Sequence, residues 1–142
     1  MKRILVALDG SPNGPKVLDA AARLAELAGA KLVLFRAIGV APDLPRQALV
    51  ESDVRVEDLL RANAHEDLER LAARIKPTLI EQIAVVLATP WDGICRAARE
   101  RDTDLIVLGS HGYGGLDRIL GTTAAKVVNH ADRNVLVVRT TL

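Results

Sequence analysis

Glycines followed by hydroxyl residues gather in the last quarter of the chain. Gly109 and Gly112 belong to a stretch with four glycines in seven residues, and Gly121-Thr122-Thr123 stands a little further on. Glycine backbone has no Cβ, so it can approach a phosphate closely. A helix beginning near Gly121 would add free N–H groups and a dipole, both of which attract anions. These residues predict a site for a negatively charged group; the alternative is that the glycines only turn the chain.

Two further positions could contribute to such a site. Asp9-Gly10-Ser11 follows a short apolar run, and Asp9 could bind a ribose hydroxyl or a magnesium ion that phosphates also hold. Asp-Gly is also an ordinary turn sequence, so Asp9 could simply cap or turn the chain. His111 lies within the glycine stretch. A histidine acting as acid or base needs a placed partner, and a contact with the ligand is the favoured role.

The elements that must position these residues alternate between strand and helix. Apolar runs predict strands at 4–8, 31–38, 80–87, 104–108 and 135–138, and apolar residues at helical spacing predict helices at 14–28, at 54–75, from Pro90 and from Gly121. Residues 39–53 are predicted to be a loop, and residues 116–120 a short helical turn. Alternation of this kind indicates a parallel sheet with helices on both faces.

Five strands in this order favour a single α/β domain over residues 1–142, with a doubly wound sheet of strand order 3-2-1-4-5. In such a sheet ligands bind beyond the carboxyl ends of the strands, where the winding changes direction. That point lies between the first and fourth strands. The Asp9 turn and the stretch beginning at Gly109 should therefore meet there.

Apolar stripes predict which helix faces are buried. The stripe of the second helix is formed by Leu59, Leu60, Leu68, Leu71, Ala72 and Ile75, and that of the last helix by Ala124, Val127, Val128 and Ala131. Cys95 has apolar neighbours at helical spacing, which is typical of a small core residue rather than a nucleophile.

Composition argues against several classes of function. The chain has 19 Lys+Arg against 18 Asp+Glu and only 2% aromatic residues, so neither charge nor stacking surface favours nucleic acid. No apolar run approaches the roughly 20 residues that span a bilayer, so no membrane association is expected. The single cysteine favours a reducing compartment, and hence the cytoplasm.

Motifs of common nucleotide enzymes are not found in the sequence. It contains no Gly-x-x-x-x-Gly-Lys-Ser/Thr loop and no Gly-x-Ser-x-Gly elbow. Three scattered histidines and one cysteine do not make a zinc pattern. We therefore expect that the protein is not an enzyme, or at most a catalyst of very slow hydrolysis.

Three sequence features together resemble the universal stress protein family. They are the opening run from Ile4 to Ser11, the pattern Gly109-x-x-Gly112 … Gly121-Thr122, and the closing run from Val135 to Val138. The resemblance covers the whole chain and is weakest across residues 39–75. It implies that the protein binds ATP, with magnesium as a possible companion, and that it acts in the stress response as a sensor or regulatory dimer.

The resemblance also implies roles for individual residues. In the ATP-binding branch the glycine stretch and the following hydroxyl residue hold the phosphates, and the aspartate after the first strand approaches the ribose and phosphates. Backbone at the end of the second strand meets the adenine. The residues this assigns to nucleotide binding are Ala7, Asp9, Ser11, Ala37, Gly109, His111, Gly112, Gly121, Thr122 and Thr123.

The sequence departs from the pattern of that branch at two places. Eight residues separate Gly112 from Gly121, where the pattern has nine. The shorter spacing could leave the loop competent or could misplace Gly121. Ala88 stands where relatives often carry glycine, and its extra methyl matters only if a ligand comes close.

The last strand raises the question of partners. Val135, Leu136, Val137 and Val138 would form a flat apolar edge strand, which invites pairing with another strand. The resemblance implies that it pairs with its copy in a homodimer; alternatively, residues 140–142 fold over it. Two other functions stay open: a nucleotide-free dimeric scaffold of the same fold, and an enzyme using adenylate or flavin chemistry.

Overall fold

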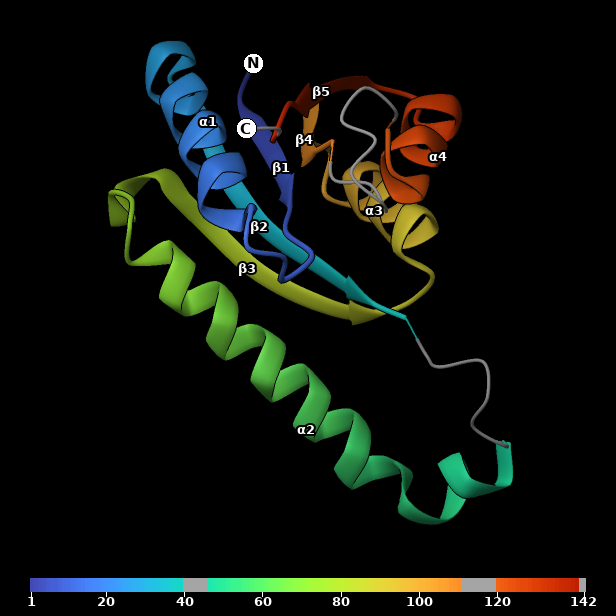
Figure 1. Cartoon of the computed structure of the whole chain (residues 1–142). Helices are drawn as coiled ribbons and strands as arrows, with labels where there is room; N and C mark the ends of the chain where they lie inside the picture. The colour runs from blue at the N-terminus through green and yellow to red at the C-terminus, as the bar shows by residue number, and fades with distance from the viewer. Residues whose placement is uncertain (40–45, 111–119, 141–142) are drawn as a thin grey trace.

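The computed structural model describes residues 1–39, 46–110 and 120–140, without the side chains of 46–55. Strands and helices alternate along this part of the chain (Figure 1). The elements are β1 (Arg3–Ala7), α1 (Gly14–Ala28), β2 (Lys31–Ile38), α2 (Arg46–Ala72), the 3₁₀ turn η1 (Pro77–Leu79), β3 (Ile80–Leu87), α3 (Pro90–Glu100), β4 (Leu105–Gly109), α4 (Thr122–His130) and β5 (Asn134–Val138).

The five strands form one parallel sheet in the order β3-β2-β1-β4-β5, which confirms the predicted topology. Central β1 pairs on both sides, so that Ile4 lies opposite Leu32 of β2 and Leu105 of β4. The chain winds outward through β2 and β3 and then returns past β1 to β4. The change of winding direction therefore falls between β1 and β4, as predicted.

Alternation of side chains along the strands divides the core into two layers. On β1, Ile4 and Val6 pack with residues of α1 and with Leu68 of α2, whereas Leu5 packs with residues of α3 and α4 on the other face. The helices accordingly cover the two faces in pairs, α1 with α2 and α3 with α4 (Figure 1). Side chains alternate between the two faces, yet successive residues of β1 and β4 are buried, as a parallel sheet covered by helices on both faces requires.

The predicted loop at 39–53 is wrong in its second half, because α2 already begins at Arg46. Among the side chains of α2 that the structure describes, Ala64 and Leu68 are buried, while the expected stripe residues Leu59 and Leu60 are exposed. The 27 residues of α2 extend about 40 Å, whereas the eight residues of β2 extend only about 26 Å. The N-terminal half of the helix therefore diverges from the sheet (Figure 1).

Smaller corrections concern helix ends and faces. The structure ends α2 at Ala72 rather than residue 75, and it begins α4 at Thr122 with Gly121 as the N-cap. Val128 is exposed, although it was expected in the inner stripe with Ala124 and Val127, which are buried. Val127 and Val128 are adjacent in sequence, so their side chains point about 100° apart around the helix, and Val128 lies outside the arc that faces the sheet.

None of the helices in the described segments combines the length and apolar character that crossing a bilayer requires.

The N-terminal end of β1 is tied to the residue preceding β4. The carboxylate of Asp104 accepts hydrogen bonds from the backbone N–H groups of Lys2, at 2.6 Å, and Arg3, at 2.9 Å. These bonds, the one from Lys2 first, lower the pKa of Asp104. Hydrogen bonding to the charged form is the physical cause.

The depressed pKa of Asp104 gives a testable pH dependence. A group whose pKa is lower in the folded than in the unfolded protein stabilises the fold above its unfolded pKa, near about 4, and loses this effect as the pH falls through the folded value. We expect Asp104→Asn to unfold at lower urea concentration than the wild type at about pH 7, with the difference shrinking towards about pH 3. Parallel pH profiles of the two proteins would contradict this.

Ile106, which is fully buried in β4, should be among the most sensitive core positions. Ile106→Ala leaves a cavity that the surrounding side chains fill only partly, and we expect it to lower the free energy of unfolding by about 2–5 kcal/mol. Urea denaturation measures this change. Leu27→Ala, at a position 80% exposed on α1, is the control and should shift stability by no more than about 0.5 kcal/mol.

Candidate functional site: a cavity at the carboxyl ends of β1 and β4

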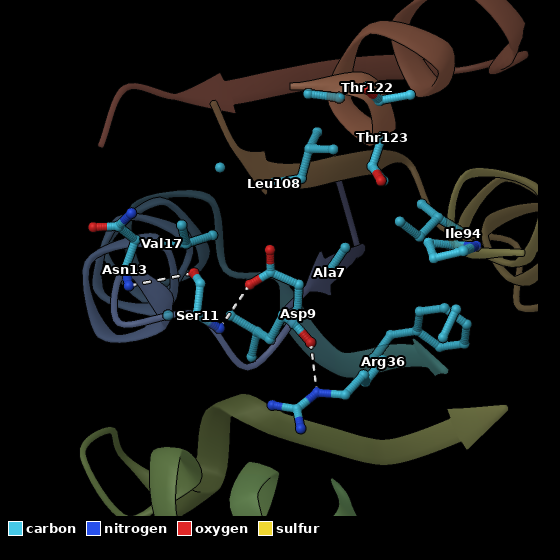
Figure 2. Close-up of a pocket in the computed structure, with 17 residues that line it drawn as sticks. Ala7, Asp9, Ser11, Asn13, Val17, Arg36, Ile94, Leu108, Thr122 and Thr123 are labelled. Atoms are coloured by element: carbon cyan, nitrogen blue, oxygen red, sulfur yellow. Dashed lines mark hydrogen bonds between the residues drawn. The ribbon is translucent and has the colours of Figure 1, made fainter. Parts of the chain in front are cut away.

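A cavity of about 320 Å³ opens at the carboxyl ends of the central strands. It lies where the winding of the sheet changes direction, and its volume falls in the range of about 300–1,000 Å³ typical of small-molecule sites. Figure 2 shows side chains from opposite sides of this space. The lining residues are Ala7, Leu8, Asp9, Ser11, Asn13, Gly14, Val17, Phe35, Arg36, Ala37, Pro90, Ile94, Leu108, Gly109, Thr122, Thr123 and Ala124.

Most of the residues predicted from the sequence come together here. Those that line the cavity are Ala7, Asp9, Ser11, Ala37, Gly109, Thr122 and Thr123. Gly121 is buried behind this lining, and its N–H donates to the carbonyl of Ser110 at 3.4 Å. His111 and Gly112 lie outside the described residues, as does most of the expected turn at 116–120.

The turn from β1 into α1 is held by its own polar groups. The carboxylate of Asp9 accepts the N–H of Ser11 at 2.9 Å through Oδ1, and the Ser11 carbonyl accepts the N–H of Gly14 at 3.0 Å. Gly10, with φ +83°, has the left-handed backbone that glycine adopts without strain. The turn that the alternative interpretation expected is thus present. Because Asp9 also lines the cavity, both interpretations hold for this residue.

The N-terminus of α4 forms the facing wall. Gly121 is extended, with φ −61° and ψ 162°, and no described side chain caps the helix. The three residues that follow, Thr122, Thr123 and Ala124, all line the cavity, and Figure 2 shows both threonines on the side opposite Asp9. Uncapped N–H groups and the positive end of the helix dipole make this wall suited to an anion.

The remaining wall is apolar and lies at the ends of β2 and β3. Ala37, Pro90 and Ile94 line it. Gly93 lets α3 approach closely here, because a Cβ on it would come within 3.1 Å of the methyls of Ala37 and Ala88. Ala88 thus faces α3 and is not among the residues lining the cavity. The apolar wall and the anion-binding wall together suit a ligand that carries both a flat apolar group and a negative charge.

Sequence reasoning missed several residues of the site, and Arg36 is the most notable. Its Nε donates to the Leu8 carbonyl at 2.9 Å, and its Nη1 lies 3.4 Å from Oδ2 of Asp67 on α2. The available signal was a charged residue inside the otherwise apolar run of β2. Asn13 and Val17 were also missed; they line the cavity from the start of α1.

The described residues of the site include few groups that could take part in covalent or metal chemistry. Cys95 is buried, and burial raises the pKa of its thiol, so it is the core residue that was predicted. Among the described residues no group of three His, Cys, Asp or Glu side chains could hold a metal ion. Magnesium usually takes one or two carboxylates together with phosphate oxygens. A lone Asp9 therefore fits such an ion only when the ligand supplies phosphates.

Comparisons of the sequence and the structure with known proteins all point to one family. The model of the universal stress protein family matches residues 1–139. Universal stress protein A homolog 2 of Coxiella burnetii is 32% identical, over 97% of this chain and 94% of that protein. The solved structure of UspA from Lactobacillus plantarum is 26% identical with a TM-score of 0.75, and covers 97% of both chains.

A second solved structure, a universal stress protein in complex with cAMP, is 28% identical with a TM-score of 0.66, and covers 99% of this chain and 98% of that one. These relatives match nearly the whole length of the chain, and the two solved structures have the same fold. With the family model matching nearly every residue, the chain belongs to the universal stress protein family.

Proposed function

We propose that this protein binds an adenine nucleotide, ATP foremost, in the cavity between β1 and β4, and acts in the cytoplasm as a dimeric sensor or regulator in the stress response. The observation that carries the proposal is the pairing of two unlike walls in one cavity. The N-terminus of α4, which no described side chain caps, faces the Asp9 turn, and an apolar wall lies beside them.

Each part of a nucleotide has a matching wall. The adenine ring suits the apolar surface of Ala37, Pro90 and Ile94, and the phosphates suit the backbone and hydroxyls of Thr122 and Thr123. The ribose then lies between them, near Asp9. The cAMP complex of a relative supports the adenine and phosphate class of ligand.

Magnesium enters the proposal only with the phosphates. One oxygen of Asp9 accepts the Ser11 N–H, and the other is available as a ligand to an ion that the phosphates hold. Hydrolysis, if any, is very slow, because a general base must lie within hydrogen-bond reach of the proton it takes. Apart from Asp9, whose Oδ1 accepts the Ser11 N–H, no described lining residue is a histidine, a lysine or a carboxylate. Occupancy rather than turnover would be the signal.

The dimer is proposed through β5. Among the described strands β5 pairs only with β4, which leaves its other edge open. Leu136 on this strand is 39% exposed. Of residues 140–142, which could have covered the edge, only Thr140 is described; it is buried, and its N–H donates to the hydroxyl of Ser110 at 3.1 Å. An open apolar edge supports pairing with a second copy across a two-fold axis.

Two substitutions should distinguish the contributions of the two walls to nucleotide binding. Thr123→Val removes one hydroxyl and should weaken the binding of ATP roughly tenfold, because a hydrogen bond to a charged group contributes on that scale. Binding of adenosine, which has no phosphate, should be unchanged. Ala37→Phe fills the apolar wall and should weaken both ligands at least about tenfold. Calorimetry with Mg-ATP and with adenosine measures these changes.

Thr78→Val, at an exposed threonine in η1, is the matched control and should bind like the wild type. Thermal unfolding checks that each variant is folded. If wild-type protein binds no adenine nucleotide, and none is released when it is denatured, the nucleotide-free scaffold is the better account. If the wild type binds ATP but Thr123→Val and Ala37→Phe bind equally well, the site lies elsewhere.

The dimer gives a separate prediction. Leu136→Arg places two like charges close together wherever β5 pairs with its own copy, and should convert the dimer to a monomer. Analytical ultracentrifugation measures the mass, with Leu27→Arg on the exposed face of α1 as the control. A monomeric wild type, or a Leu136→Arg variant that sediments as the dimer, would exclude pairing through β5.

A further inference from the structure

Arg36 lines the proposed nucleotide cavity next to the turn that follows β1. It stands on β2 one residue before Ala37, and its side chain is only 11% exposed. Figure 2 shows the side chain reaching towards the turn that carries Asp9 and Ser11. Its Nε donates to the carbonyl of Leu8, the residue that directly precedes Asp9, at 2.9 Å. A largely buried cation is thus attached to the backbone of the turn that contributes to the site.

A second contact joins the guanidinium to the same turn. A Cβ on Gly10 would lie 3.3 Å from Cζ, Nη1 and Nη2 of Arg36, so the Gly10 backbone packs directly on the guanidinium. Gly10 also has φ +83°, which permits the close approach. Arg36 therefore supports the turn from below through one hydrogen bond and one packing contact.

The other end of Arg36 is held by α2. Nη1 lies 3.4 Å from Oδ2 of Asp67, whose Oδ1 in turn pairs with Arg70 at 3.1 Å. Nη2 is buried and has no hydrogen-bond partner among the described residues. An unpartnered buried donor is costly, and a single long ion pair to a half-exposed Asp67 compensates the charge weakly. The position of the guanidinium is therefore sensitive to where α2 lies.

We propose that Arg36 is a positioning residue for the Asp9 turn and that, through Asp67, it couples the position of α2 to the nucleotide site. The inference rests on the proposed function for the identity of the ligand. When α2 holds Asp67 against Arg36, the turn is ordered for binding. When the pair separates, the turn loosens and affinity falls. By linkage, a bound nucleotide must favour the paired arrangement to the same extent.

Replacing arginine by lysine can distinguish a positioning role of Arg36 from a purely electrostatic one. A lysine would keep the positive charge, but it cannot hold both the Leu8 carbonyl and Asp67 as the guanidinium fork does. If Arg36 acted only through its charge near the phosphates, Arg36→Lys would bind nucleotide like the wild type. If it positions the turn, Arg36→Lys should bind nearly as weakly as Arg36→Gln.

The first test is a double-mutant cycle on ATP affinity, measured by calorimetry. We expect Arg36→Gln to weaken binding about tenfold and Asp67→Asn about threefold. In the Arg36→Gln background Asp67→Asn should have almost no further effect, because contacting residues are not additive. Independent effects that multiply in the double variant would overturn the coupling.

Two controls isolate the pair. Arg70→Gln removes the other partner of Asp67 and should leave affinity unchanged. Asp19→Asn breaks the 2.8 Å ion pair with Arg74, which joins α1 to the residues following α2 but does not touch the Asp9 turn. If Asp19→Asn weakens ATP binding as much as Asp67→Asn does, the loss of affinity reflects a general loss of stability, and the proposal fails.

The second test needs no ligand, so it also decides the case in which the wild type binds no nucleotide. Hydrogen exchange of the backbone amides of residues 8–14 reports the order of the turn. We expect exchange at least about threefold faster in Arg36→Gln and in Asp67→Asn than in the wild type, with the amides of β4 unchanged. Unchanged exchange in residues 8–14 would reject the positioning role, even if ATP binds. Absent ATP binding with faster exchange would reject the proposed function alone.

Discussion

Parallel pairing of β1 with both β2 and β4 is the constraint on which the rest of the structure depends. α1, which follows β1, and α4 lie on opposite faces of the sheet, so none of the described helices crosses the carboxyl end between β1 and β4. The cavity lies in this position. Apart from Arg36 within β2, the polar residues of its described lining stand in the turn after β1 or at a helix start.

The walls of this cavity differ because they arise from different elements. The turn after β1 is held by its own residues Asp9 and Ser11 and by the side chain of Arg36, so its polar groups already have partners before a ligand binds. The start of α4 has no side-chain cap in the described chain, which leaves its N–H groups to a ligand. One wall is thus already hydrogen-bonded within the protein, and the other presents N–H groups without a described side-chain partner. Such a site suits an anion, because binding orders little of the protein and gives partners to these N–H groups.

The long helix α2 packs against the sheet over only part of its described length. Its C-terminal half packs through Ala64 and Leu68, while Val56, Leu59 and Leu60 remain exposed. A helix longer than the sheet beneath it cannot bury its whole apolar stripe. Asp67 lies within the packed half and reaches Arg36. The same element therefore contacts the site at one end and extends away from the sheet at the other.

Much of the fold and of the site was predictable from the amino-acid sequence. Apolar runs such as 4–8 and 104–108 identify strands by local pattern. The rule that ligands bind where the winding changes then places Asp9, Gly109 and Thr122 together, although they are far apart in the sequence. Local chemistry and one topological rule suffice for these residues, because each sits directly after a strand or at the start of a helix.

Only the tertiary structure decided the rest. The start of α2 at Arg46 and the exposure of Leu59 and Val128 depend on how much sheet surface each helix meets, which no local pattern states. The role of Arg36 depends on Leu8 and Asp67, which are 28 and 31 residues away. Contacts between elements so distant in sequence are set by packing geometry, and the charge in an apolar strand shows only that such a partner must exist.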